Sequence, residues 1–226
     1  SVAGTVDFTQ PLQVIRADST HDASGGRRPT LMFRDSTVVT AILPDGSSQV
    51  ITGPVSVRVQ EATVGELGAA RMPAELPATS AYTYAVALNL DTALALGTSQ
   101  VTFSKPVAIH VDNFLGVPVG SDVPVGYYDV KAGRWVAQPD GRIIKILSVT
   151  AGLADLATDT AGAQATPAQL AALGIDTLEQ ARLAATYPVG KTLSRITTTH
   201  FSWLDLNYGE SLPADAIPPN GGRPTP

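Results

Sequence analysis

The sequence contains no cysteine among its 226 residues, only three histidines, and few charged side chains (15%). The absence of cysteine excludes disulfide bonds and thiolate metal sites. His21, His110 and His200 are far apart in the sequence and belong to no spaced ligand motif, so we expect neither a metal site nor a cofactor. The net charge is −5 and no basic cluster is present, which argues against nucleic-acid binding, because phosphate contacts need grouped cations.

Long hydrophobic runs are missing as well. No apolar stretch approaches the roughly 18 residues of a transmembrane helix, so we expect no membrane span. Residues 1–4 do not resemble a secretory signal peptide, and we expect the sequence to begin inside a longer protein. Hydrophobic residues nevertheless make up 44% of the chain, which is enough for a substantial core.

Short segments of alternating apolar and polar residues recur along most of the chain, separated by turns rich in glycine and proline. Residues 55–60 alternate cleanly, and residues 123–130 and 134–137 are typical of a hairpin. Pro139-Asp140-Gly141 predicts a further turn before a strand at 142–149. Strands without long helices between them predict a mostly β protein with an antiparallel β-sandwich fold.

The pattern changes at residues 150–192, where two short helices are predicted. Thr166 is the N-cap of the first, and Asp176 opens a capping box at the start of the second. One face of the second helix carries Leu178, Ala181 and Ala185. We therefore predict a β-sandwich domain over residues 1–212, with this small two-helix insertion near its C-terminal strands. Residues 213–226 have the composition of a proline- and glycine-rich linker.

The segment 197–207, Thr-Thr-Thr-His-Phe-Ser-Trp-Leu-Asp-Leu-Asn, carries the most specific chemistry in the chain. A regular strand would place His200, Ser202 and Leu204 on one face and Phe201 on the other. An imidazole beside a hydroxyl is the minimum for nucleophilic attack, and the nearest carbonyl is that of Phe201. The leading hypothesis is self-cleavage between Phe201 and Ser202.

The expected mechanism is an N-to-O acyl shift followed by hydrolysis of the ester. His200 would accept the proton of the Ser202 hydroxyl, since an imidazole with a pKa of roughly 6.5 is a suitable base near neutrality. A planar trans amide resists this attack. We therefore expect the packed sheet to strain the bond and hold it in place.

Several alternatives are open from the residues alone. His110 lies in an apolar run and is either a hydrogen-bonded histidine or a second active-site imidazole brought beside Ser202 by strand pairing. A His-x-Ser sequence in an edge strand is usually inert, so a non-catalytic spacer competes with self-cleavage. The carboxylates that could orient the base are Glu61, Glu66, Glu75, Asp112 and Asp129. A third alternative is a surface-binding module that uses Tyr127, Tyr128 and Trp135.

The His200-Phe201-Ser202 motif resembles the cleavage motif of ZU-five-like and function-to-find autoproteolytic β domains. The nucleoporin autoproteolytic domain has a similar His-Phe-Ser, and GAIN domains a related His-Leu-Thr. The segment 103–107, Phe-Ser-Lys-Pro-Val, is also similar to a strand of ZU-five-like domains. The resemblance implies a single-turnover serine autoprotease without activity in trans, with His200 as base and Ser202 as nucleophile. It also implies that the C-terminal strand stays bound in the sheet after cleavage. Some function-to-find domains take the base from an upstream strand, which keeps His110 as a candidate.

A second resemblance covers most of the chain. The chain looks like a domain that precedes the repeat shell in large bacterial RHS/YD-repeat proteins. Those proteins are secreted or surface-displayed and include many polymorphic toxins. The segments that carry this resemblance are 101–107, 111–116, 123–129, 141–145, 184–190 and 199–201. It implies a secreted or cell-surface location as part of a larger protein, with a downstream RHS repeat region as partner. The alternative function then becomes a β-sandwich spacer that links an N-terminal region to the repeats.

Overall fold

The computed structural model describes residues 2–64, 68, 71–74, 82–98 and 100–208. Within these residues the fold is mostly β, with three helices, and the paired strands are antiparallel. The predicted mostly β, antiparallel class is therefore confirmed. The predicted linker at 213–226 lies outside the described residues.

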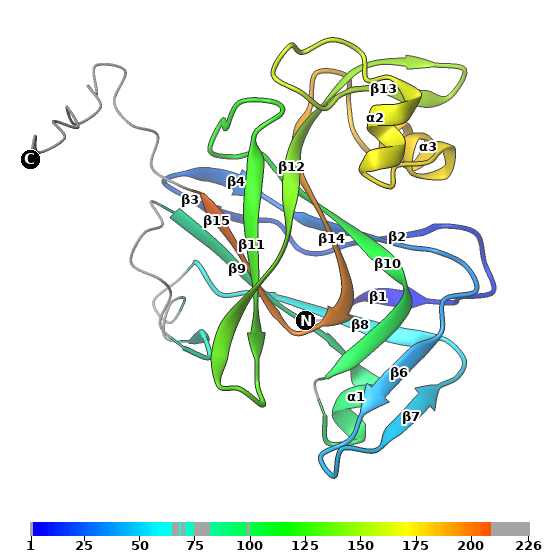
Figure 1. The fold of residues 1–226 in the computed structure, drawn as a ribbon, viewed down its shortest axis with the longest axis vertical. Helices are drawn as coiled ribbons and strands as arrows, with labels where there is room; N and C mark the ends of the chain where they lie inside the picture. Colours follow the sequence, from blue (N-terminus) through cyan, green and yellow to red (C-terminus); the bar gives the residue numbers. More distant parts are fainter. Residues whose placement is uncertain (1, 65–67, 69–70, 75–81, 99, 209–226) are drawn as a thin grey trace, which may run out of the picture.

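The elements follow one another along the chain as shown in Figure 1. The strands of the first half are β1 (Val2–Val6), β2 (Gln13–Arg16), β3 (Thr20–Asp22), β4 (Gly25–Arg27), β5 (Pro29–Phe33), β6 (Val39–Ile42), β7 (Ser48–Ile51), β8 (Val55–Glu61) and β9 (Tyr82–Leu90). The later strands are β10 (Val101–Asp112), β11 (Asp122–Asp129), β12 (Arg134–Thr150), β13 (Leu153–Ala157), β14 (Thr192–Phe201) and β15 (Trp203–Tyr208). The helices are α1 (Asp91–Ala95), α2 (Pro167–Ala172) and α3 (Thr177–Thr186).

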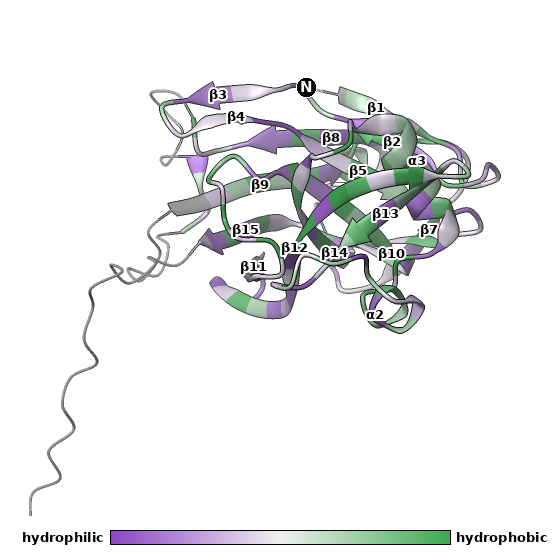
Figure 2. Ribbon diagram, turned by 90° about the horizontal axis from the view of Figure 1, so that it is seen from above, coloured by the Kyte–Doolittle hydropathy of each residue, from purple (hydrophilic) through white to green (hydrophobic). Residues whose placement is uncertain are grey.

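Thirteen of the strands form one continuous sheet with the order β1-β8-β9-β15-β11-β12-β14-β10-β5-β2, to which β13, β6 and β7 are attached. The sheet curls so far that its two end strands approach each other. A Cβ added at Gly4 of β1 would lie 2.7 Å from Cδ1 of Ile15 of β2. The β3 and β4 strands form a separate hairpin, and β3 is hydrophilic (Figure 2).

Alternating side chains of the curled sheet build the main core. In β8, Val55, Val57 and Val59 are buried, as the sequence alternation predicts. Residues from every strand of this path belong to one cluster, which includes Leu31, Phe33, Tyr84, Leu88, Phe103, Ile109, Ile143, Phe201 and Leu204. The sheet therefore encloses a single hydrophobic centre, and the candidate site lies at its wall.

A smaller layer covers part of the outer face of the sheet, where β13, α2 and α3 lie together (Figure 1). Ile144, Leu156 and Leu183 are among the buried residues of the second cluster, which fills the space between this layer and the sheet. The two predicted helices are present, and Thr166 forms a capping box with Gln169. The strand β13 in the same region was not predicted; it pairs with β12.

Two sequence predictions in this half of the chain are wrong in detail. The face predicted to be buried on α3 is not the one that packs against the sheet. Leu178 is 48% exposed, whereas Glu179 and Leu183 are buried. Pro139-Asp140-Gly141 is not a turn between two strands, because β12 runs through it with a register shift opposite β11. A Cβ at Gly141 would come within 2.6 Å of the carbonyl oxygen of Arg195, so the glycine permits the close approach of β14.

Candidate active site

The chain changes its neighbours in the sheet at Ser202. Strand β14 ends at Phe201 and pairs with β10 and β12, whereas β15 begins at Trp203 and pairs with β9 and β11. Ser202 lies between the two strands, and its carbonyl oxygen accepts a hydrogen bond of 3.0 Å from the amide of Leu88. The Phe201–Ser202 bond is therefore at a corner of the sheet, with ordered strands on both sides.

The regular alternation expected for this segment breaks at the corner. Phe201 and Leu204 both belong to the main core, although they are three residues apart, so Leu204 does not share a face with His200 as predicted. The strand is also irregular before the motif. The hydroxyl of Thr198 donates to the carbonyl of His200 at 2.9 Å and accepts from its amide at 3.3 Å. His200 itself still pairs with Thr102 of β10, so the irregularity lies in the segment just before it.

Phe201 is the apolar anchor that the sequence predicts. It is 1% exposed, and its ring centroid lies 4.7 Å from that of Phe103 and 6.1 Å from that of Phe33. Rings packed edge to face in this way favour one orientation. The carbonyl on the acyl side of the proposed cleavage bond is thus attached to a fixed residue.

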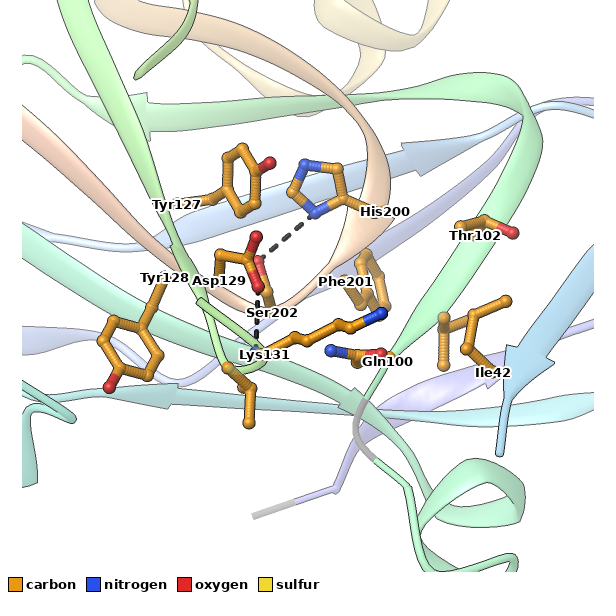
Figure 3. Close-up of a pocket in the computed structure, with 12 residues that line it drawn as sticks. Ile42, Gln100, Thr102, Tyr127, Tyr128, Asp129, Lys131, His200, Phe201 and Ser202 are labelled. Atoms are coloured by element: carbon orange, nitrogen blue, oxygen red, sulfur yellow. Dashed lines mark hydrogen bonds between the residues drawn. The ribbon is translucent and has the colours of Figure 1, made fainter. Parts of the chain in front are cut away.

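The side chains of His200 and Ser202 point toward each other (Figure 3). The Ser202 Oγ lies 3.3 Å from Nδ1 of His200, and it also donates to the carbonyl oxygen of Trp203 at 3.1 Å. A hydroxyl carries one proton, so it must rotate from Trp203 to the imidazole before His200 can accept that proton. Deprotonation also needs the His200 tautomer with its proton on Nε2.

The surroundings of His200 favour the neutral, basic form of its side chain. Burial lowers the pKa of the imidazole from its ordinary value of 6.5, because a partly desolvated ring disfavours the charged form. The ring of Tyr127 packs against it with 4.5 Å between centroids. Among the residues that the structure describes, Ser202 is the hydrogen-bond partner of the ring, and no carboxylate orients it.

The carboxylates considered as orienting groups are engaged elsewhere or lie outside the described residues. Glu61 binds Arg27, and Asp112 binds Lys191. Asp129 lines the same pocket as His200 but accepts from the backbone amides that follow it. Glu66 and Glu75 lie outside the described residues. The side chain packed against the imidazole is that of Tyr127, whereas the sequence predicts a carboxylate there.

A pocket of about 320 Å³ reaches the motif from the molecular surface. Its walls come from Ile42 at the end of β6, the start of β10, the turn between β11 and β12, and residues 200–202 (Figure 3). Water can therefore reach the Phe201–Ser202 bond from this side. Hydrolysis of an ester formed here needs such access.

The expected backbone strain does not take the form of a left-handed residue at the motif. In the described part of the chain, the non-glycine residues with positive φ are Ser36 and Ala151. The irregularity at the motif consists of the broken alternation and the side-chain bonds of Thr198.

The structure places His110 at a different site from Ser202. His110 of β10 pairs with Arg195 of β14, five residues before His200, and its Nε2 donates to Glu179 of α3 at 3.1 Å. It is therefore the hydrogen-bonded histidine of the two alternatives. Tyr128 packs its ring on Trp135 at 5.6 Å, so two of the three aromatic residues considered for surface binding contact each other.

Comparison of the chain with family models, curated proteins and solved structures finds no match. Within the described ranges, none of the helices has the length and hydrophobicity of a membrane span.

Proposed function

We propose that this chain is a self-cleaving domain that cuts its own backbone between Phe201 and Ser202. The observation that carries the proposal is the contact of 3.3 Å between Ser202 Oγ and His200 Nδ1 at the corner between β14 and β15. The nucleophile, the base and the scissile carbonyl are neighbours in one chain, so attack is intramolecular, an advantage of up to roughly 7–11 kcal/mol.

The reaction proceeds in two balanced steps. His200 accepts the hydroxyl proton of Ser202 as Oγ bonds to the carbonyl carbon of Phe201. The bond from that carbon to the Ser202 nitrogen then breaks, and the nitrogen takes the proton back from His200 and becomes an amine. Water attacks the resulting ester, which releases the Phe201 carboxylate and restores the Ser202 hydroxyl. Each chain reacts once.

The sheet pairing supports continued association of the two fragments. After cleavage, residues 1–201 would keep β14 between β10 and β12, and the second fragment would keep β15 between β9 and β11. Leu204, Leu206 and Tyr208 of β15 are buried in the main core. The C-terminal strand is therefore the first partner of the cleaved domain.

The wider setting that we propose is a large secreted or cell-surface bacterial protein of the RHS type, with toxin-associated repeats downstream. This part of the proposal comes from the sequence resemblance. A non-catalytic spacer in the same setting is the competing function.

A denaturing gel with mass spectrometry tests the proposal directly. The purified chain should appear as residues 1–201 and 202–226, which co-elute under native conditions, and Ser202→Ala should remain one band. Thr199→Ala is the matched control, because Thr199 is an exposed neighbour in the same strand and should cleave normally. A wild-type chain that stays intact for days would favour the spacer.

A further inference from the structure

The buried carboxylate of Glu179 joins the helical layer to the strand that carries His200. Its Oε1 accepts from Nε of Arg195 at 2.6 Å, and its Oε2 accepts from the second guanidinium nitrogen at 3.0 Å. Oε1 also accepts from Nε2 of His110 at 3.1 Å. We call these three residues, Glu179, Arg195 and His110, the Glu179 clamp. The three are 0–5% exposed.

The charges of the clamp are well matched. Burial alone would raise the pKa of the Glu179 carboxyl, but the hydrogen bonds from Arg195 and His110 lower it to about 2. Glu179 is therefore ionised at neutral pH and compensates the buried charge of Arg195. Arg34 adds a more distant contact at 3.9 Å from its position after β5.

The clamp spans a register pair of the sheet. His110 of β10 and Arg195 of β14 are direct partners, so both reach one carboxylate only in the observed register. A slip of one residue would turn Arg195 to the other face of the sheet. A slip of two residues would separate the two donors by roughly 7 Å along the strand.

The ladder of β10 with β14 is interrupted between the clamp and the His200 motif. The pairing of β10 with β14 shifts between Val107, opposite Thr198, and Thr102, opposite His200. Pro106, within this gap, has no amide proton to donate. The position of His200 and Phe201 along β10 therefore depends on where β14 is held before the irregular segment, and the regular ladder there, from Val107 to Asp112, contains the clamp.

We propose that the Glu179 clamp positions the scissile segment, so that the helical layer sets the register of β14 and through it the contact between His200 and Ser202. The proposal rests on the self-cleavage proposed above. It assigns Glu179 and Arg195 as positioning residues, since neither belongs to the reacting atoms. It also gives the helical insertion a role in the reaction.

The test compares cleavage rate with stability in the full chain. The variant Glu179→Leu/Arg195→Met/His110→Phe removes the charges and donors together, because replacing a complete buried ionic group by apolar residues is often neutral for stability. Cleavage in a cell-free synthesis time course should slow by roughly 100-fold, as expected for a misplaced reacting group. The melting temperature should stay near that of wild type. Leu183→Ala is the control: it opens a cavity under α3 and keeps all three clamp side chains, so it should lower the melting temperature while cleavage keeps its rate.

Two further measurements keep the outcome decisive. Glu179→Gln, studied in parallel, keeps the shape of the side chain and should slow cleavage by about tenfold, even if the triple variant fails to fold. Amide hydrogen exchange in a Ser202→Ala background should show lost protection at residues 197–201 when the clamp is removed and unchanged protection there in Leu183→Ala. Wild-type cleavage rates in the Glu179 variants, or unchanged exchange at 197–201, would overturn the proposal. If wild type itself does not cleave, self-cleavage fails, and hydrogen exchange still decides whether the clamp sets the register.

Discussion

The aromatic ring of Tyr127 packs against the imidazole of His200, with 4.5 Å between the centroids and an angle of 59° between the planes. Tyr127 belongs to β11, which pairs with β15, so the strand that follows Ser202 also brings this ring to the histidine. Tyr127→Ala should therefore slow cleavage by about two- to tenfold, because aromatic pairs contribute about 0.5–1.5 kcal/mol. Tyr127→Phe keeps the ring and should cleave normally. Tyr128→Ala is the adjacent control, and a normal rate for Tyr127→Ala would remove Tyr127 from the site.

The rate of cleavage should depend on pH through His200. Burial lowers the pKa of this imidazole below 6.5, and only the neutral ring can accept the Ser202 proton. The rate should therefore be constant from about pH 6.5 upward and fall only below the lowered pKa. Time courses of cleavage in buffers on both sides of this value measure the profile. A half-maximal rate above 6.5 would contradict the assignment of His200 as the base.

The same pKa shift predicts a dependence of folding stability on pH. The unfolded chain binds a proton at His200 more readily than the folded chain, so stability is lost as the pH falls from 6.5 to the lowered pKa. Urea unfolding of the uncleaved Ser202→Ala chain should show this loss. It should be smaller in Ser202→Ala/His200→Phe, which has no group to titrate at this position.

Phe201 should be a main contributor to the stability of the corner. In the uncleaved Ser202→Ala background, Phe201→Ala should lower the free energy of unfolding by about 3–5 kcal/mol, because it removes a buried ring and leaves a cavity beside Phe103. Phe201→Leu should lose much less, since it keeps most of the apolar volume. Chemical denaturation measures both variants. A loss below about 1 kcal/mol for Phe201→Ala would show that the ring does not anchor the segment.

Gly126 and Asp205 form a close pair between β11 and β15. A Cβ at Gly126 would lie 2.2 Å from Oδ1 of Asp205. Gly126→Ala should therefore destabilise the fold by about 1–3 kcal/mol. The double variant Gly126→Ala/Asp205→Ala should recover part of this loss, which a double-mutant cycle measures. Additive effects of the two substitutions would show that the conflict is not with Asp205.

The sequence predicts much of this structure where one local rule acts alone. The alternation of β8 and the capping of α2 by Thr166 depend on neighbouring residues only, and both are present. The hairpin of β11 and β12 follows from its turn residues in the same way. The spacing of His200 and Ser202 also predicts their contact, because the two flank the buried Phe201 and the alternation breaks only after Ser202.

The sequence predictions fail where contacts between distant segments determine the structure. Pro139-Asp140-Gly141 has the composition of a turn, but Gly141 lies inside β12, where its lack of a side chain allows β14 to pack closely. Leu178 is exposed and Glu179 buried, because Arg195 and His110 supply partners that no pattern within α3 can reveal. Tyr127 beside His200 depends on a register between strands far apart in sequence.

Because β15 lies between β9 and β11, loss of this strand would expose the edges of both neighbours. Both β9 and β11 would become open edges with unpaired amides and carbonyls facing a vacant groove, and part of the hydrophobic centre would be uncovered. Such a gap accepts an extended segment of similar pattern by strand complementation. A synthetic peptide of residues 202–208 should therefore compete for the groove in any cleaved molecule that has lost its own strand.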